Sequence, residues 1–362
     1  MDRSELEAIR NKIDDIDRKL SELLQERMDL VSQVADYKRK NNAEILDEGR
    51  EKKVIENVLS SVSNPDYTEN IKAIFQFIMD NSKEYQRKRL VEKGKFQKLV
   101  LLGEKLSHSI SPQIHGMFFK RANIEGQYDL REVSYSEIPD ILNILRNEGY
   151  TGANVTIPYK TEIMKYLDEI SPTALRIGAI NTIKIGEKCT GYNTDYFGFG
   201  KSLEFFGVSI KGKRCAVLGS GGSSRAIVSY LEDQGAESIV IVTRDTIKAA
   251  IKYPHLRCIP INYFSAMGYD LVVNATPVGM YPKTGDSPIT KEQLCGAGFV
   301  MDIIYNPSMT LLLEYAEELG IPYANGLYML VAQAISAQEI WQGESINQEI
   351  TNSIYRELKD EI

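Results

Sequence analysis

A glycine-rich segment between an apolar run and an amphipathic run constrains the fold of this chain more than any other feature. Residues Val217–Arg225 read VLGSGGSSR, after a strand-like pattern and before a helix-like one. A strand, a glycine turn and a helix in this order predict a dinucleotide-binding fold. Ser224 replaces the usual third glycine, so the loop alone is a weak indication. The loop residues expected to contact the cofactor are Gly219, Ser220, Gly221 and Gly222.

Composition limits the classes of partner. The chain has 362 residues and a net charge of −7, which predicts two or three domains and disfavours nucleic acid as the main partner. The N-terminus is charged rather than signal-like, and no apolar run approaches the roughly 20 residues that cross a bilayer. We therefore expect no membrane partner. The cysteines are far apart and form no metal motif, which favours free thiols in the cytoplasm and no metal site. They are Cys189, Cys215, Cys258 and Cys295.

The N-terminal stretch has the pattern of one long helix. Apolar residues recur at steps of three and four, and neither Gly nor Pro interrupts Leu6–Lys40. Such a helix would be roughly 50 Å long, too long for two shorter helices of the same chain to cover. The sequence therefore predicts an intertwined homodimer. The apolar positions are Leu6, Ile9, Ile13, Ile16, Leu20, Leu23, Leu30, Val34 and Tyr37.

Polar residues interrupt the apolar faces of this stretch and of two predicted helices after it. Arg27 stands in the apolar seam, where a snorkelling surface arginine is the alternative interpretation. A charge that faces a helix bundle usually needs an anionic partner. We therefore predict a pocket for a small polyanion. Its candidate residues are Arg10, Arg27, Lys38, Arg50, Ser82 and Gln86, with Asp47 as an N-cap and Glu51 beside Arg50.

Three segments of residues 1–90 resemble the all-helical class of chorismate mutase. They begin LEAIRNKIDDIDRKL, ILDEGREKKVIE and IFQFIMDNSKEYQ. The resemblance implies that arginines clamp the two carboxylates of chorismate, with Arg27, Lys38 and Gln86 as catalytic residues and the last two donating to the ether oxygen. The implied site residues are Arg10, Arg27, Lys38, Asp47, Arg50, Glu51, Ser82 and Gln86.

The spacing of two of these residues limits how they can act. Arg10 and Lys38 are roughly 42 Å apart on one helix, so they cannot touch one ligand from one chain. Arg10 therefore either enters the site of a partner subunit, as in the dimers of that class, or has no role.

Beyond residue 96 the chain alternates strand-like and helix-like patterns. Ser109 and Ser111 precede a predicted helix that begins at Pro112, where hydroxyls and the helix terminus can hold a carboxylate. Lys160 ends a strand and loop. A lone lysine there is usually a surface charge, but beside a carboxylate in a cleft it can act as a general acid or base. Asp195 lies in a predicted turn and could supply that carboxylate.

The same region resembles the shikimate dehydrogenase family across almost all of its length. The matching segments, in the family's order, are HSISPQIH, GANVTIPYK, AINT, GYNTD, GSGGSSRA, NATPVGM, DIIYNP and NGLYMLVAQA. The resemblance implies that Lys160 and Asp195 are the catalytic pair in NADPH-dependent reduction of 3-dehydroshikimate. It implies a substrate pocket of Ser109, Ser111, Thr156, Asn181, Tyr305 and Gln333.

Basic residues at the end of the second predicted nucleotide strand indicate the cofactor. Arg244 stands where a basic residue favours the 2′-phosphate of NADP, and Lys248 lies one turn further on. Asp245 adds a nearby negative charge, so NAD remains an alternative to NADP(H). The remaining predicted cofactor contacts are Thr243, Ala275, Thr276 and Gly326, the last three on the nicotinamide side.

Together these patterns predict a multidomain chain, with an all-α three-helix module of an intertwined dimer before an α/β shikimate dehydrogenase. The predicted domains are residues 1–90 (helical), 97–195 with 328–362 (substrate) and 196–327 (Rossmann dinucleotide-binding), with a linker at 91–96. The predicted function is bifunctional, in aromatic amino-acid biosynthesis: chorismate to prephenate, and 3-dehydroshikimate to shikimate. One alternative makes the helical module a dimerising or regulatory scaffold with little mutase activity. Another makes the rear part a non-catalytic NADP-dependent sensor.

Overall fold

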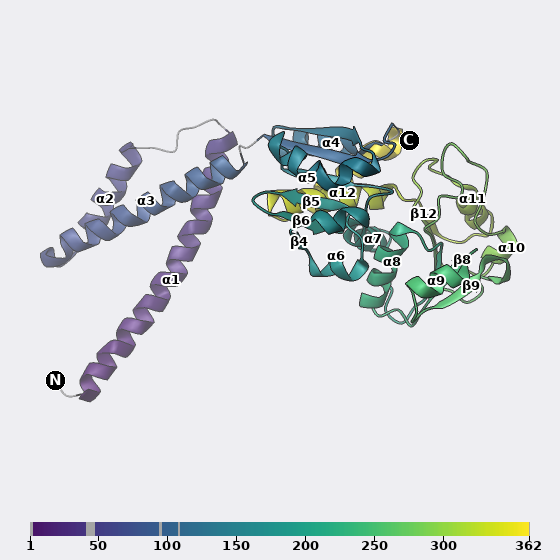
Figure 1. Ribbon diagram of the computed structural model, residues 1–362. Helices are drawn as coiled ribbons and strands as arrows, with labels where there is room; N and C mark the ends of the chain where they lie inside the picture. The colour runs from purple at the N-terminus through teal and green to yellow at the C-terminus, as the bar shows by residue number, and fades with distance from the viewer. Residues whose placement is uncertain (1–2, 41–47, 94–95, 108, 362) are drawn as a thin grey trace. The chain divides into compact units, whose positions relative to one another are not determined.

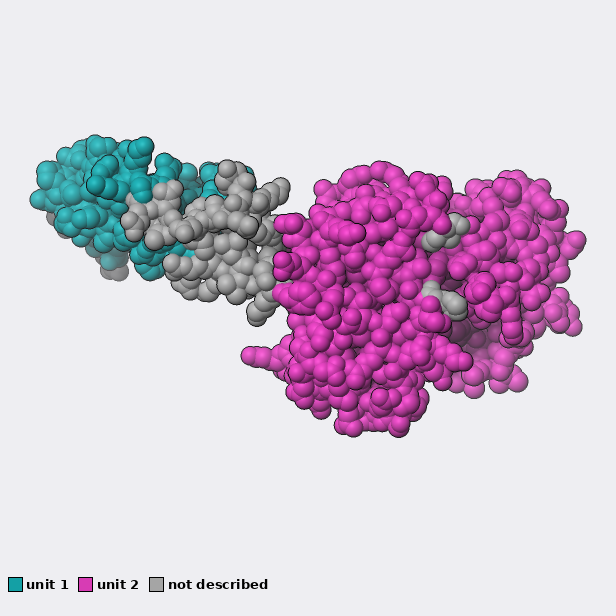
Figure 2. Space-filling view, turned by 90° about the horizontal axis from the view of Figure 1, so that it is seen from above, with its two compact units in different colours: residues 1–95 teal, residues 96–362 magenta. Residues whose placement is uncertain are grey.

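The computed structural model describes residues 3–40, 48–93, 96–107 and 109–361. The chain divides into two compact units, residues 1–95 and 96–362 (Figure 2). Each unit has its own secondary structure and is described separately. None of the helices in the described ranges has a stretch long and apolar enough to cross a membrane.

All the regular secondary structure in the described residues of the first unit is helical, as the apolar periodicity predicts. It consists of α1 (Arg3–Lys40), α2 (Glu48–Ser60), a short 3-10 helix, η1 (Pro65–Tyr67), and α3 (Thr68–Lys93) (Figure 1). The Asn64 side chain accepts a hydrogen bond from Asp66 N and begins η1. Helices α1 and α2 both pack against α3. Along α1, apolar side chains of the seam remain exposed in this single chain: Ile9, Ile13, Ile16, Leu20, Leu23, Leu30 and Val34.

The second unit contains two sheets, of which the first is mixed. Its strands lie in the order β2-β1-β3-β5-β6-β4. Strand β1 pairs in parallel with β2 and β3, whereas β3 with β5 and β5 with β6 are antiparallel. The strands are β1 (Gln97–Gly103), β2 (Gly126–Glu132), β3 (Gly152–Val155), β4 (Glu169–Ile170), β5 (Thr182–Ile185) and β6 (Cys189–Tyr192).

The C-terminal helices return to this first sheet. Helices α4 (Ser111–Ala122), α12 (Leu327–Gln342) and α13 (Gln348–Glu361) share one apolar cluster with β1. Helix α5 (Ile138–Asn147) belongs to a second cluster with β1, β3 and β5. Trp341 of α12 donates from Nε1 to the Ile183 carbonyl at 2.9 Å. The end of the chain is therefore part of the core that begins at residue 97.

The second sheet is parallel and has the strand order of a dinucleotide-binding fold. Its order is β12-β11-β10-β7-β8-β9, so the chain starts in the middle with β7 and reverses direction between β7 and β10. Ligands of such sheets bind at the carboxyl ends of the strands beside this reversal. The strands are β7 (Arg214–Leu218), β8 (Ser238–Thr243), β9 (Arg257–Pro260), β10 (Leu271–Asn274), β11 (Val300–Asp302) and β12 (Tyr323–Ala324).

Helices flank this parallel sheet and connect its strands. They are α8 (Gly222–Asp233), α9 (Thr246–Lys252), η4 (Ile261–Tyr263), α10 (Lys291–Leu294) and α11 (Leu311–Glu318) (Figure 1). Between the two sheets in sequence lies α7 (Thr194–Phe205), after η2 (Tyr135–Glu137), η3 (Glu162–Tyr166) and α6 (Pro172–Ile177). Phe199 of α7 belongs to the core of the parallel sheet, and Phe205 stacks on Tyr328 of α12. Helix α7 therefore packs on both parts of the unit.

Candidate functional site

A nearly buried ion pair forms the centre of the site in the second unit. Lys160 Nζ lies 2.6 Å from Asp195 Oδ2, and the two side chains are 15% and 12% exposed. Lys160 follows β3, and its carbonyl accepts a hydrogen bond from Ile180 N at 2.8 Å. Asp195 lies in the first turn of α7, which the Asn193 side chain caps. Two segments 35 residues apart in sequence are thus held together at one point.

Asn181 orients the carboxylate of this pair. Its Nδ2 donates to Asp195 Oδ1 at 2.8 Å, and its Oδ1 accepts from Thr194 N at 2.7 Å. Gln333 of α12 also contacts Thr194, because its Oε1 accepts from Thr194 Oγ1 at 3.3 Å. Both oxygens of Asp195 therefore have partners, and the residues predicted from AINT, GYNTD and the C-terminal helix lie together.

Two residues behind Asn181 belong to this network although we did not predict them. Tyr128 donates from its hydroxyl to Asn154 Oδ1 at 2.7 Å, and Asn154 Nδ2 donates to the Asn181 carbonyl at 3.1 Å. Burial raises the pKa of the Tyr128 hydroxyl, and a hydrogen bond with Ser111 lowers it in part. Asn154 lies within GANVTIPYK, so that motif contained a signal for it; Tyr128 lies in an ordinary strand pattern that contained none.

The neighbouring histidine has a packing role. His115 stacks on Tyr128, and its Nδ1 lies 2.8 Å from Nε2 of Gln338. Burial lowers the pKa of His115 to about 3, so the ring is neutral at physiological pH.

The remaining predicted substrate residues lie on different elements of the same unit. Ser109 Oγ donates to Ser111 Oγ at 3.1 Å at the start of α4. Thr156 follows β3, and its backbone N donates to the Leu102 carbonyl. Tyr305 is partly buried against the cluster that contains α4 and α12, and this burial raises the pKa of its hydroxyl. Ser111 joins the Asn181 network through Tyr128.

The glycine turn after β7 has the geometry that an anion needs. Gly219 adopts φ +99°, a conformation that L side chains rarely adopt. Gly221 is the N-cap of α8 and supplies no side-chain cap, so the first amides of α8 have no side-chain acceptor there. A Cβ at Gly222 would meet no atom within 4 Å. These features fit the phosphates of a dinucleotide.

Ser224 explains why this loop tolerates the missing third glycine. The side chain is fully buried, and its Oγ donates to the Gly219 carbonyl at 2.9 Å. The serine therefore restrains the turn through the Gly219 carbonyl. On the other side, a Cβ at Gly219 would come within 2.7 Å of Thr276 Cγ2 and 3.3 Å of the Ala275 backbone. The loop and the segment after β10 are in direct contact.

The predicted nicotinamide-side residues are fixed by a buried carboxylate. Asn274 Nδ2 donates to Asp302 Oδ1 at 3.0 Å, and Asn274 Oδ1 accepts from Thr276 N and Oγ1. Gly326 lies just before α12, where a Cβ would approach the Ile303 carbonyl to 2.0 Å. Gly326 is therefore required at least by packing.

The cationic residues after β8 are exposed, and the nearby acid has a local role. Arg244 and Lys248 are exposed, while Thr243 is buried at the end of the strand. Asp245 caps α9, because its side chain accepts from Lys248 N at 2.9 Å. Its carboxylate is therefore engaged with the start of α9, so its negative charge is less unfavourable to a 2′-phosphate bound nearby.

In the first unit, Arg27 bonds to another predicted site residue. Arg27 Nη1 donates to Ser82 Oγ at 2.5 Å, and Ser82 is 4% exposed. Burial lowers the pKa of the Arg27 guanidinium. Arg27 thus joins α1 to α3 instead of snorkelling into solvent. Arg10 lies on the same helix, roughly 25 Å from Arg27, and is exposed.

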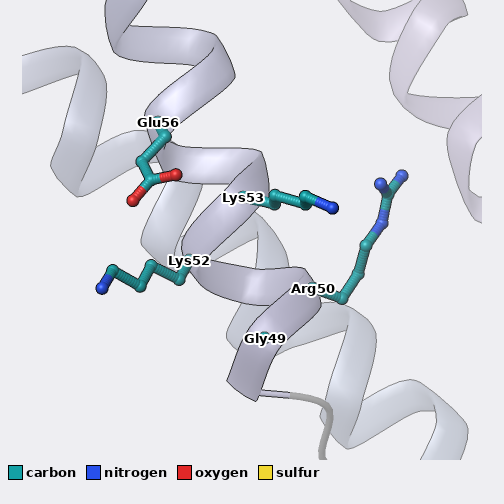
Figure 3. Close-up of a pocket in the computed structure, with 5 residues that line it drawn as sticks. All are labelled: Gly49, Arg50, Lys52, Lys53 and Glu56. Carbon is teal, nitrogen blue, oxygen red and sulfur yellow. The ribbon is translucent and has the colours of Figure 1, made fainter.

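Arg50 lies at the start of α2, in a mainly cationic hollow of about 540 Å³. In Figure 3, Arg50 and Lys53 extend from the same side of α2. Lys52, Glu56 and Gly49 complete the lining. The predicted side chains of Lys38, Asp47, Glu51 and Gln86 lie outside the residues whose side chains are described.

The fold and the site together define an α/β oxidoreductase of the dinucleotide-binding class, which follows an all-helical domain in the sequence. The chain matches the models for chorismate mutase type II over residues 9–87 and for the shikimate dehydrogenase substrate-binding domain over residues 101–183. It belongs to the shikimate dehydrogenase family and has a chorismate mutase domain N-terminal to the dehydrogenase.

Three relatives support this assignment. The chain is 44% identical to the shikimate dehydrogenase (NADP(+)) of Clostridium perfringens strain 13 over 266 residues, which are 72% of this chain and 97% of that protein. The crystal structure of a chorismate mutase/shikimate 5-dehydrogenase fusion protein from Clostridium acetobutylicum is 44% identical, has a TM-score of 0.72 and covers 74% of this chain and 99% of its own. Shikimate 5-dehydrogenase of Thermus thermophilus, solved with NADP(H) and shikimate, is 31% identical, has a TM-score of 0.66 and covers 72% and 99%.

The carboxylate that fixes Asn274 gives a pH-dependent prediction. Burial raises the pKa of Asp302 to about 6, above the roughly 3.9 of an unfolded aspartate. The folded state therefore binds more protons between these values, and the contribution of Asp302 to stability falls as pH rises through them, by on the order of 3 kcal/mol. The substitution Asp302→Asn mimics the protonated acid. We expect the free energy of unfolding of this variant, relative to that of the wild type, to be higher at about pH 7 than at about pH 4.5.

Urea unfolding of both proteins at the two pH values measures this difference. The Thr310 hydroxyl, which donates to Asp302 Oδ2 at 2.7 Å, can rotate to accept from the new amide. An equal difference in unfolding free energy between the two proteins at both pH values would contradict a raised pKa for Asp302.

Proposed function

We propose that the second unit catalyses the reversible NADPH-dependent reduction of 3-dehydroshikimate to shikimate, and that the first converts chorismate to prephenate. The dehydrogenase proposal rests on the Lys160–Asp195 pair, which is nearly buried and is oriented by Asn181. The mutase proposal rests on the Arg27–Ser82 contact within a helical bundle. We further propose that the two domains of the second unit are residues 97–195 with 328–362 and residues 196–327, preceded by the mutase domain at 1–90 and a linker at 91–96.

Lys160 is the proton donor and acceptor in this proposal. The bound nicotinamide supplies or accepts the hydride. In the reductive direction, Lys160 gives a proton to the oxygen of the carbonyl being reduced; in the oxidative direction, it takes the proton from that hydroxyl. Asp195 holds the ammonium in place and accepts from a substrate hydroxyl. The hydroxyls of Ser109 and Ser111, at the start of α4, bind the substrate carboxylate.

The remaining substrate contacts come from elements that meet at Asn181. Asn181 and Gln333 share Thr194 as a partner, so both amides are fixed before substrate binds. With Thr156 they bind substrate hydroxyls, and Tyr305 closes the same pocket. Pre-organised donors of this kind reduce the entropy lost on binding.

NADP(H) is the proposed cofactor, as it is in the Thermus thermophilus complex. The amides of Gly221 and Gly222, with Gly219 and Ser220 forming the turn, hold the pyrophosphate. Arg244 and Lys248 bind the 2′-phosphate, beside Thr243. Ala275, Thr276 and Gly326 flank the nicotinamide.

The mutase site combines cations of α1 and α2 with neutral polar side chains of α3. Arg27 binds one carboxylate of chorismate, with Ser82 beside it, and Arg50 binds from α2. Lys38 and Gln86 donate to the ether oxygen, where negative charge grows as the C–O bond breaks. Asp47 and Glu51 complete the set, and Arg10 enters the site of a partner subunit.

We also propose a homodimer in the cytoplasm. The apolar side chains of α1 are 45–62% exposed in one chain, at Ile9, Ile13, Ile16, Leu20, Leu23, Leu30 and Val34. A second copy of α1 would cover them and bring Arg10 to the other subunit. The four cysteines are free thiols, which supports a reducing compartment.

Replacing Lys160 tests the dehydrogenase assignment. We expect Lys160→Met to lower kcat for shikimate oxidation by about a hundredfold or more, because the general acid–base group is lost. Shikimate binding, measured by calorimetry, should weaken far less. Lys188→Met is the matched control, since Lys188 also pairs with a carboxylate, Glu169, but on the surface. Turnover of Lys160→Met at the wild-type rate would exclude this role and favour a sensor.

Replacing Arg27 separates a mutase from a scaffold. We expect Arg27→Ala to lower prephenate formation by about a hundredfold, because one charge-assisted donor to the substrate is removed. Shikimate oxidation should be unchanged. Arg18→Ala is the control, since Arg18 pairs with Asp15 and is exposed. Absence of prephenate formation by the wild-type chain would favour the scaffold.

A charge in the apolar seam tests the dimer. Ile16→Glu places a carboxylate where the second copy of α1 would pack, so we expect monomers by light scattering after size-exclusion chromatography. Asn11→Glu adds the same charge on the opposite face of α1 and should leave a dimer. A wild-type monomer would refute the proposal.

Arg244 tests the choice of cofactor. Loss of a charge-assisted bond to a phosphate costs roughly 1.5–3 kcal/mol, so Arg244→Ala should lower kcat/KM for NADP by about ten- to a hundredfold and leave that for NAD nearly unchanged. Arg257→Ala, at the start of β9, is the control. An equal loss for both cofactors would place Arg244 outside the 2′-phosphate site.

A further inference from the structure

Lys252, the last residue of α9, has an unusual pair of partners. Its Nζ donates to the Ser220 and Gly221 carbonyls, each at 2.5 Å. Both carbonyls belong to the glycine turn after β7, 31 and 32 residues away in sequence. A lysine at the end of one helix thus holds the loop that begins another. We did not predict a role for this residue.

The planarity of the peptide bond gives this contact a consequence for the other side of the turn. In a trans peptide unit the C=O and N–H groups point in opposite directions. The Ser220 carbonyl shares its unit with Gly221 N–H, and the Gly221 carbonyl shares its unit with Gly222 N–H. By binding both carbonyls, Lys252 turns these two N–H groups away from itself. Beyond Gly222 the space is open, because a Cβ there would meet no atom within 4 Å.

The electrostatic setting also indicates an anion at this place. Lys252 lies near Arg225 of α8 and Lys248 of α9, which act on it as like charges, and over the ring of Tyr253 at 5.3 Å. Within the described ranges, no carboxylate forms an ion pair with Lys252, Lys248, Arg225 or Arg244. Such a group of cations in a chain of net charge −7 is stabilised when an anion binds.

We propose that Lys252 is a positioning residue for the cofactor, whose ammonium fixes the Ser220–Gly222 turn so that the Gly221 and Gly222 N–H groups face the pyrophosphate. This inference rests on the proposed function of the second unit as an NADP(H) enzyme. Three glycines among four residues leave the turn few restraints of its own. The ammonium supplies a restraint, and it polarises both peptide units toward a bound anion.

The charge of Lys252 makes the effect dependent on pH. Burial, together with Arg225 and Lys248, lowers the pKa of Lys252 to about 8. The ammonium holds the turn below this value and is lost above it, so NADP affinity falls as pH rises from about 7 to about 9.5. Arg225 and Lys248 are the charged groups that face Lys252 from α8 and α9, and Tyr253 is the titratable group beside it. Burial raises the pKa of the Tyr253 hydroxyl, which remains neutral in this range.

Binding of NADP⁺ to the full chain, measured by isothermal calorimetry, tests the proposal. We expect Lys252→Met to raise the Kd about tenfold at about pH 7 and to lose the pH dependence of the wild type. Lys252→Arg should restore part of the affinity, without the decline at high pH. Lys291→Met is the control, because Lys291 binds Glu318 on the surface of the same sheet domain. At saturating NADP⁺, the KM for shikimate should stay close to wild type for all variants, which separates loss of cofactor positioning from a general loss of structure.

The outcomes separate this inference from the proposal beneath it. If the wild-type chain does not bind NADP⁺, the cofactor assignment itself fails. If the wild type binds NADP⁺ and Lys252→Met binds it equally well, or keeps the wild-type pH dependence, Lys252 does not position the turn.

Discussion

The ion pair between Lys160 and Asp195 is the interaction on which the second unit depends. Taking two charges out of water is costly, and the cost is recovered only when the geometry is good and the remaining hydrogen-bonding positions are filled. Here one carboxylate oxygen accepts from the ammonium and the other from Asn181. The rest of the network, from Thr194 to Gln333, fixes Asn181 in turn. The unit therefore holds the Lys160 ammonium in one orientation in the absence of substrate.

A second constraint is common to both units: an acidic chain has to bind anions. We propose that it does so with local groups of cations and with backbone amides, while the net charge remains −7. In the helical unit, Arg27 is half-buried against Ser82 in an otherwise apolar seam. In the parallel-sheet domain, cations gather around the glycine turn and the start of α8 offers uncapped amides. Both arrangements cost folding free energy without a ligand and are explained by one.

Much of the fold could be predicted because its signals are local. The steps of three and four along α1, and the strand, turn and helix around Gly219, depend only on neighbouring residues. The structure confirms a helical front unit and a dinucleotide-binding sheet, and the comparisons confirm the family. Lys160, Asp195 and Asn181 were found through motifs, and the structure brings them into contact.

The residues that were missed act over long sequence distances. Tyr128 lies in a strand pattern like any other, and its contact with Asn154 exists only because β2 and β3 flank β1. Lys252 ends a short helix, where a lysine is ordinary, and its link to Ser220 depends on how α9 packs. No pattern of spacing along the chain reports such pairs. Asp245, by contrast, looked like a repulsive charge and is a helix cap.

The most direct test of the account is a crystal structure of the full chain with NADP⁺ and 3-dehydroshikimate, a pair that cannot react. The account predicts Lys160 Nζ within hydrogen-bonding distance of the ketone oxygen, with Asp195 still bound to Lys160 and Asn181. A ketone oxygen held by other groups, with Lys160 turned away from the substrate, would contradict it.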